Sequence, residues 1–276
     1  MAKKTTQEKM IGRHPIKDSI FAKWLVCNDL DCTDNKIHRS LTVNSTYEDE
    51  AVEEVANWLI NHHLPKRKRD FLGKKKAILE KYDFNEYADS LHIFPTEDKT
   101  KKGNLGEVIL SEYLRASSGI DILIYKLRYN PNVDQSMKGD DVLLVNDKKI
   151  LLGESKFRTV AAKSVVEEIS NNFGKVLTLP ISLSFIADRL YEEGEFELSD
   201  KIVEIETILP KGKIDVQNIG LILSDLSAHR SVERHMNSNN KNFIIITLNV
   251  NNPNNLLKKS FDKAQERIKG NFPYAY

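Results

Sequence analysis

Residues Lys138–Phe157 read "KGDDVLLVNDKKILLGESKF", and this stretch decides the fold. Its two apolar runs, "DVLLV" and "ILLGESKF", are separated by "NDKK", which predicts a β-hairpin. Acidic residues stand at the start of the first run, and Glu-Ser-Lys lies inside the second. Burying such charges is costly unless they are paired, solvated or bound to a metal. We therefore expect these residues to form a site rather than to fill the core.

The hairpin has a simple register. If the chain turns at residues 147–148, Asp141 lies opposite Glu154 on one face of the sheet. Strand alternation puts Lys156 on the same face and Asp140 on the other. Because the turn contains no glycine, this register is a hypothesis that only a structure can test.

Such a pair of carboxylates favours a metal site. Their Cβ atoms would be roughly 5 Å apart, so the two charges repel unless a positive charge lies between them. Mg2+ prefers oxygen ligands of this kind, and Mn2+ accepts them as well. A bound divalent cation lowers the pKa of its water and neutralises charge on a phosphodiester, while Lys156 can orient the attacking water. The alternative is an ion-pair cluster of Asp141, Glu154 and Lys156 with no chemistry.

The composition is that of a globular protein. Hydrophobic residues make up 40% of the 276 residues and charged residues 29%, with a formal net charge of +1. Any nucleic-acid surface must therefore be local. No apolar run could span a bilayer, and "MAKKTTQEKM" lacks a hydrophobic signal region, so we expect a cytoplasmic protein. Cys27 and Cys32 are expected to be free thiols, since no spacing supplies the other ligands of a zinc site.

The N-terminal part is predicted to be mostly helical. The segment "STYEDEAVEEVANWLINHHL" has apolar residues at helical spacing, and Ser45 with Glu48 predicts a capping box. The adjacent His62 and His63 end this helix, where a favourable helix C-terminus is a plainer interpretation than a metal pair.

A basic segment, "KRKRDFLGKKK", follows this helix. Seven of the eleven residues from Lys66 to Lys76 are basic. A solvated helix face, an acidic protein partner and a phosphate-backbone contact all account for this pattern.

The remaining elements alternate between helix and strand. The order predicts a mixed α/β sheet with helices on its faces. The expected elements are a helix at 103–119, a strand at 120–129, a loop at 130–139, the hairpin strands at 141–145 and 150–157, helices at 160–175, 184–194 and 197–209, strands at 218–225 and 242–250, and a closing helix through Leu257, Phe261, Ala264 and Ile268.

This order and the charged motif resemble a known superfamily. "GDD", twelve residues and then Glu-Ser-Lys resemble the D-x(n)-E-x-K core of PD-(D/E)xK nucleases, which carry a helix, a hairpin, and then another helix and strands. More narrowly, "GNLGEVILSEYL", "KGDDVLLV" and "LLGESKF" resemble the HamA nuclease family of Hachiman antiphage defence systems. The resemblance implies a mixed central sheet flanked by helices. It divides the chain into a mainly helical accessory region, residues 1–98, and a nuclease core, residues 99–276.

The resemblance also assigns roles to residues. It makes Asp141 and Glu154 metal-binding carboxylates and Lys156 the catalytic lysine. Asp140 is the weaker candidate ligand because strand alternation turns it away. This chain departs from the Pro-Asp that gives the superfamily motif its name, since Gly139 and Asp140 precede Asp141.

A further acidic residue is expected from the preceding helix. The resemblance makes Glu107 an accessory catalytic acid. Asn104 and Glu107 are also spaced as a helix-capping pair, so both interpretations stay open.

The resulting prediction is a metal-dependent DNA endonuclease using Mg2+ or Mn2+. This chain has no Gly-x-x-x-x-Gly-Lys-Ser/Thr loop, so it is not expected to hydrolyse nucleotides itself. The resemblance implies a separately encoded helicase partner, HamB, that would supply ATP hydrolysis. Lys74, Lys75 and Lys76 are expected to dock that partner. Two rivals remain: a catalytically inactive nucleic-acid-binding or scaffolding module that docks on a helicase, and a regulatory protein whose basic segment binds an acidic partner.

Overall fold

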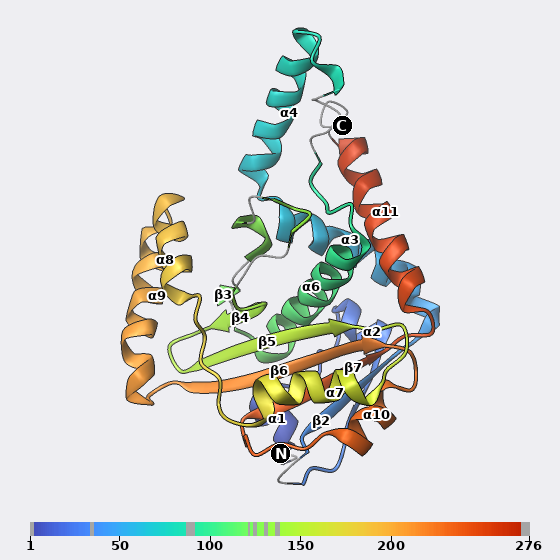
Figure 1. Cartoon of the computed structure of the whole chain (residues 1–276), viewed down its shortest axis with the longest axis vertical. Helices are drawn as coiled ribbons and strands as arrows, with labels where there is room; N and C mark the ends of the chain where they lie inside the picture. The colour runs from blue at the N-terminus through green and yellow to red at the C-terminus, as the bar shows by residue number, and fades with distance from the viewer. Residues whose placement is uncertain are drawn as a thin grey trace.

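The structure, a computed structural model, places seven strands in one mixed sheet of order β1-β2-β7-β6-β5-β4-β3 (Figure 1). It describes residues 3–33, 36–86, 92–120, 122–123, 126–129, 132–135 and 139–271. The strands are β1 (Leu25–Asp29), β2 (His38–Val43), β3 (Ile122–Leu123), β4 (Val142–Val145), β5 (Lys149–Phe157), β6 (Asp215–Ser224) and β7 (Phe243–Asn249).

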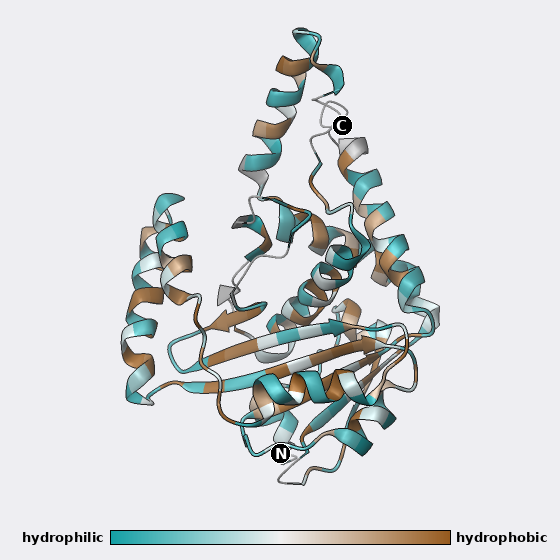
Figure 2. Ribbon diagram, viewed as in Figure 1, coloured by the Kyte–Doolittle hydropathy of each residue, from teal (hydrophilic) through white to brown (hydrophobic). Residues whose placement is uncertain are grey.

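The centre of the sheet is parallel and its edges are antiparallel. Strands β2, β7, β6 and β5 run parallel to one another, whereas β1 pairs antiparallel with β2, β4 with β5, and β3 with β4. Strands covered on both faces read as continuous apolar runs, and Figure 2 shows the central strands as predominantly hydrophobic.

Helices cover both faces of the sheet (Figure 1). One face packs against α1 (Thr6–Ile11), α2 (Ile20–Trp24), α3 (Glu48–His63), α6 (Asp98–Ser118) and α11 (Pro253–Asn271). The other packs against α7 (Lys163–Ile169) with its π-helical continuation η3 (Ser170–Gly174), the hairpin of α8 (Leu183–Glu192) and α9 (Phe196–Ile208), and α10 (Ala228–His235). Short 3-10 helices are η1 (Ser45–Tyr47), η2 (Lys126–Tyr129) and η4 (Leu209–Lys211), and α4 (Lys66–Lys81) projects away from the sheet.

The predicted hairpin and its register are confirmed. Val145 pairs with Ile150, and the ladder between β4 and β5 ends at Val142 and Gly153. Alternate residues of β4 enter the two cores, with Val142 on the side of α6 and Leu143 on the side of α7. This register brings the positions of the charged motif to one end of the hairpin.

A side chain replaces the missing glycine in the hairpin turn. Asn146 Oδ1 accepts hydrogen bonds from the backbone N–H groups of Lys148 (3.0 Å) and Lys149 (2.8 Å). Asn146 N–H also donates to the Lys149 carbonyl at 2.9 Å. An asparagine that bonds the backbone ahead of it stabilises a turn without requiring a left-handed residue.

Two glycines let α6 lie close to β5. A Cβ on Gly106 would come within 2.6 Å of Ser155 Oγ, and one on Gly153 within 2.9 Å of Leu110 Cδ2. A side chain at either position would force one of these neighbouring side chains to shift. The close approach places Glu107, the next residue of α6, beside the open end of the hairpin.

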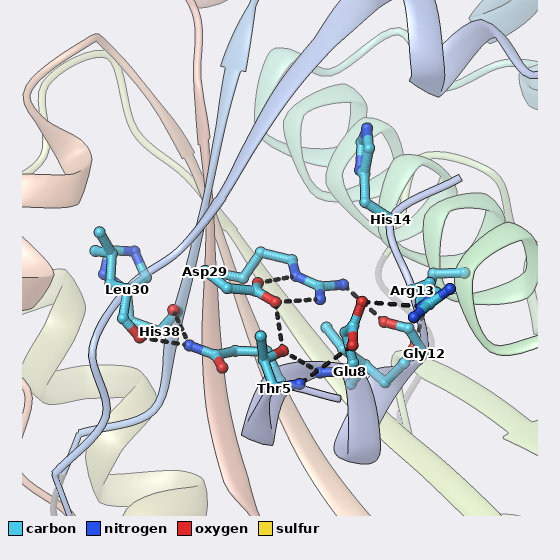
Figure 3. A network of polar contacts seen from close by, with 12 residues as sticks. Thr5, Glu8, Gly12, Arg13, His14, Asp29, Leu30 and His38 are labelled. Atoms are coloured by element: carbon cyan, nitrogen blue, oxygen red, sulfur yellow. Dashed lines mark hydrogen bonds and ion pairs between the residues drawn. The ribbon is translucent and has the colours of Figure 1, made fainter. Parts of the chain in front are cut away.

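A buried ion pair fixes the N-terminal segment to the sheet (Figure 3). Arg39 Nε lies 2.6 Å from Asp29 Oδ1, and its Nη1 donates to the Gly12 carbonyl at 3.0 Å. Thr5, which caps α1, donates from Oγ1 to Asp29 Oδ2 at 2.7 Å. The arginine is fully buried, so these partners are needed to offset the cost of removing its charge from water.

The N-terminal part is mainly helical as predicted, but it also supplies two strands that the sequence pattern did not predict. Strand β2 pairs in parallel with β7, and β1 extends the sheet beyond it. The sheet therefore crosses the predicted boundary at residue 98. Helices α1, α2 and α10 were likewise not predicted.

Two local predictions are wrong. The Ser45–Glu48 capping box does not form, because Ser45 lies in η1 and α3 begins at Glu48 without a side-chain cap. The strand expected at residues 120–129 is reduced to β3, and η2 replaces its second half. Parts of that segment and of the loop at 130–139 lie outside the described residues.

Candidate active site at the open end of the hairpin

Asp141 stands immediately before β4 and is paired with a buried lysine. Its Oδ1 accepts a hydrogen bond from Lys126 Nζ at 3.0 Å. Lys126 comes from η2 and is 8% exposed, whereas the Asp141 side chain is 31% exposed. The carboxylate thus lies at the boundary between the interior and solvent, with its counter-ion on the inner side.

Glu107 adds a second carboxyl group to this cluster. The residue is half-buried, but its Oε2 atom is buried and has no hydrogen-bond partner among the described residues. Burial, followed by the charge of Asp141, raises the pKa of Glu107 to about 8, and the positive charge of Lys126 opposes this shift. The single positive charge of Lys126 therefore cannot neutralise both carboxyl groups when both are ionised.

The helix-capping interpretation of Glu107 is wrong. Helix α6 begins at Asp98 with Glu97 at the N-cap, so Asn104 and Glu107 both lie inside the helix. Asn104 instead makes a 2.9 Å hydrogen bond to His63 Nε2. A buried carboxyl group in a helix interior, without a capping role, is available to a site.

Glu154 and Lys156 form a second group on β5. Lys156 Nζ lies 2.7 Å from Glu154 Oε1 and 2.8 Å from Oε1 of Glu168 on α7. Asn172 Nδ2 donates to both oxygens of Glu154, at 3.1 and 2.8 Å. Burial lowers the pKa of Lys156, but its bonds to Glu154 and Glu168 outweigh this effect and raise the pKa above its ordinary value. Lys156 is therefore a fixed positive charge rather than a ready proton acceptor.

Both groups lie at the open end of the hairpin, but they do not contact each other. The positions of Asp141 and Glu154 follow the last pair of the ladder, Val142 and Gly153. Within the part of the chain that the structure describes, no hydrogen bond or ion pair joins the groups, and no three His, Cys, Asp or Glu side chains are arranged to hold a metal ion. The predicted ion-pair cluster of Asp141, Glu154 and Lys156 does not form. Lys156 pairs with Glu154, but Asp141 pairs with Lys126 instead.

The donor set nevertheless fits a hard divalent cation. Carboxylate oxygens are the ligands that Mg2+ and Mn2+ prefer. Glu107 Oε2, beside Asp141, supports a metal site. It is a buried carboxyl oxygen without a hydrogen-bond donor among the described residues, so nothing in the metal-free protein offsets the cost of its burial.

Asp140 has a structural partner. Its Oδ2 accepts hydrogen bonds from the backbone N–H groups of Ile181 and Ser182, both at 2.9 Å, and its own N–H donates to Ser182 Oγ at 2.9 Å. These bonds fasten the start of the hairpin to the start of α8.

The adjacent histidines are structural as well. His62 Nε2 lies 2.8 Å from Glu112 Oε1, and His63 Nδ1 lies 2.7 Å from the Leu59 carbonyl oxygen. Burial lowers the pKa of both rings, to about 4 for His63. Both residues end α3 as predicted, and since the neutral form is favoured, His63 interacts with the helix end through this hydrogen bond rather than through a charge.

The three lysines predicted to dock a partner differ in exposure. Lys74 is exposed and Lys75 is half-buried, but Lys76 is 1% exposed, with Nζ 3.8 Å from Glu80 Oε1. A partner cannot reach the Lys76 ammonium without moving α4, so the docking prediction is restricted to Lys74 and Lys75. The neighbouring Phe71 is 64% exposed.

Sequence reasoning missed Lys126, Glu168 and Asn172. Lys126 did leave a signal, because it is a charge inside the apolar run "IDILIYKLRY". Glu168 and Asn172 lie on the helical segment after the hairpin, four residues apart and on one side, which is the spacing that faces a neighbouring strand.

None of the helices in the described ranges has the length and apolarity to cross a bilayer.

Comparison with known proteins extends over nearly the whole chain. The HamA family model matches residues 18–264. The Hachiman protein HamA of Bacillus cereus is 52% identical over 264 residues, which cover 96% of this chain and 97% of that protein. Since the family model matches most of the chain and the relative is 52% identical over nearly its whole length, the chain belongs to the HamA family.

Proposed function

We propose that this chain is a metal-dependent DNA endonuclease, the effector of an antiphage defence system that works with a separately encoded helicase. The observation that carries the proposal is the open end of the hairpin, where Asp141 stands before β4 beside Glu107, and Glu154 and Lys156 lie on β5 beyond the last pair of the ladder. Membership of the HamA family supports the place in defence.

Two carboxyl groups would hold the metal, and a third would assist them. Asp141 and Glu154 are the proposed ligands, with Glu107 as the accessory acid from α6. A bound Mg2+ or Mn2+ supplies an activated water and neutralises charge on the scissile phosphate. Lys156, which Glu154 and Glu168 hold in its charged form, would orient that water and stabilise negative charge developing on the phosphate.

The surroundings of Glu154 fix its position in advance. Both of its oxygens accept from Asn172, and Lys156 approaches Oε1, so the carboxylate has one well-defined orientation. Catalytic groups that are already oriented lose no free energy to rearrangement during the reaction. This arrangement supports a reactive role for Glu154 and Lys156.

A helicase partner would solve the problem of finding DNA. With a formal net charge of +1, the chain has little long-range attraction for a polyanion. A partner that already holds the nucleic acid would deliver the substrate to the open end of the hairpin. The exposed side of α4, with Lys74 and Lys75, is the proposed docking surface.

The test is a titration of MgCl2 and MnCl2 against cleavage of linear and supercoiled DNA. Wild type should cleave only with metal, and Lys156→Ala should lose cleavage at every metal concentration. Lys201→Met, which removes a lysine from the pair with Asp147 at the far end of the hairpin, is the control and should cleave normally. Cleavage in EDTA, or full activity of Lys156→Ala, would contradict the proposal.

A catalytically inactive scaffolding module is the second candidate. It is favoured by the pairing of Asp141 with Lys126 and of Glu154 with Lys156, which leaves each carboxylate with its own counter-ion. If this candidate is correct, cells that carry Lys156→Ala in place of wild type will keep full defence against phage. Loss of defence by this variant, with an intact fold and partner binding, favours the nuclease.

A further inference from the structure

The short helix η2 places a cation beside the proposed metal ligands. Lys126 Nζ donates to Asp141 Oδ1 at 3.0 Å, and its charge also acts on Glu107. We propose that Lys126 is an internal counter-ion that occupies part of the metal site in the resting protein and must leave Asp141 when a divalent metal binds. This inference rests on the proposed metal-dependent function and adds a residue that sets the affinity for metal.

The burial of Lys126 depends on its ion pair with Asp141. Removing an ammonium group from water costs several kcal/mol unless a charged partner compensates it. Among the described residues, Lys126 forms its ion pair with Asp141, whose side chain is partly exposed. The lysine is therefore held inside by the same carboxylate that the metal would need.

One lysine does not fully neutralise the cluster. Asp141 and Glu107 together carry two carboxyl groups, and Oε2 of Glu107 has no donor among the described residues. A divalent cation supplies twice the charge of an ammonium group and coordinates several oxygens at once. Metal binding is therefore still favourable, but its affinity is reduced by the free energy needed to displace Lys126.

The lysine can move without disturbing the sheet. Lys126 lies on a four-residue 3-10 helix, an element that holds its conformation weakly, and the lysine side chain is long and flexible. The other end of η2 is anchored, because Arg128 Nε donates to the Asn61 carbonyl at 2.9 Å and Lys68 Nζ donates to the Arg128 carbonyl at 2.8 Å. The ammonium group can therefore turn away while the helix remains attached to α3 and α4.

The first measurement is Mn2+ binding to the DNA-free protein by titration calorimetry. Lys126→Met removes the charge but keeps a long apolar side chain, and we expect its affinity for Mn2+ to rise about tenfold, the equivalent of one lost charged hydrogen bond. Lys201→Met loses the same charge from the lysine–aspartate pair with Asp147, and its affinity should equal that of wild type.

The second measurement uses the wild-type protein, so it stands even if Lys126→Met fails to fold. Hydrogen exchange of the peptide that contains residues 126–129 should become faster when Mn2+ binds, because the start of η2 loses its attachment to Asp141 and opens more often, although its other end stays anchored. A peptide with residues 209–211, the 3-10 helix η4 outside the site, should not change.

The outcomes separate this inference from the proposed function. Equal or weaker Mn2+ binding by Lys126→Met overturns the counter-ion role, while Mn2+ binding by wild type leaves the metal site standing. If the variant does not fold, unchanged or slower exchange at residues 126–129 overturns the role instead. If neither wild type nor variant binds Mn2+, the proposed metal site fails and this inference fails with it.

Discussion

Replacing Glu107 with glutamine should change how the stability of the metal-free protein depends on pH. Burial and the nearby charge of Asp141 raise the pKa of Glu107 from its ordinary 4.5 to about 8. An acid whose pKa is higher in the folded state stabilises the fold fully below the unfolded value. This contribution is lost as the pH rises through the folded value. Wild type should therefore lose stability between pH 4.5 and pH 8 in a way that a glutamine cannot.

The size of the effect follows from the same pKa. Between the two values, each pH unit changes the free energy of unfolding by about 1.4 kcal/mol, so wild type should lose up to about 3 kcal/mol relative to Glu107→Gln from pH 5 to pH 7. The buried amide has its own cost of about 1–3 kcal/mol if it finds no partner, but this cost does not vary with pH. The difference in slope therefore isolates the carboxyl group.

The assay is urea unfolding in EDTA at pH 5, 6 and 7, with the free energy of unfolding taken from linear extrapolation. The matched control is Glu97→Gln, an exposed glutamate at the start of the same helix, whose values should run parallel to those of wild type. If Glu107→Gln also runs parallel to wild type from pH 5 to pH 7, the carboxyl group is not held in its neutral form and the reasoning is refuted.

Three further predictions concern the site and the docking surface. Asp141→Asn should abolish metal-dependent cleavage and weaken Mn2+ binding at least tenfold, measured by gel assay and calorimetry, because it removes a proposed ligand; strong cleavage by this variant would exclude the role. Lys156→Ala should lose cleavage but keep most of its DNA affinity in a binding titration, because its proposed contribution is made in the transition state; equal losses of both would make it a phosphate-binding residue. Reversing Lys74 and Lys75 to glutamate should reduce co-purification with the helicase at least fivefold, whereas Lys258→Glu on α11 should not; a loss of salt-dependent DNA binding with intact partner binding would instead identify a phosphate contact.

The hairpin could be predicted from the sequence because its information is local. Two apolar runs and a short polar turn predict a hairpin, a turn at residues 147–148 gives its register, and the ladder of β4 and β5 follows that register. The helices with regular apolar spacing, such as α3 and α11, were predictable for the same reason.

The strands at the N-terminal end could not be predicted, because their partners are distant in sequence. Strand β2 buries Arg39, which no apolar pattern would place in a sheet interior, and Asp29 on β1 provides its counter-ion. Lys126 is buried in the same manner, by a carboxylate outside its own element. A paired charge in the interior is recognisable only when both members of the pair are known.

The position of β7 between β2 and β6 has a consequence for synthesis on the ribosome. His38 and Thr247, which make a buried 3.0 Å hydrogen bond across β2 and β7, are 209 residues apart in the chain. Likewise, strand β5 can be paired on both sides only after its parallel neighbour β6 has been synthesised. Because proteins emerge from the N-terminus onward, Glu154 and Lys156 leave the ribosome well before the sheet that holds them can close. A chain that has not yet reached β6 and β7 would therefore lack an ordered catalytic site, and the proposed nuclease would become competent to cut DNA only after these two strands have been synthesised.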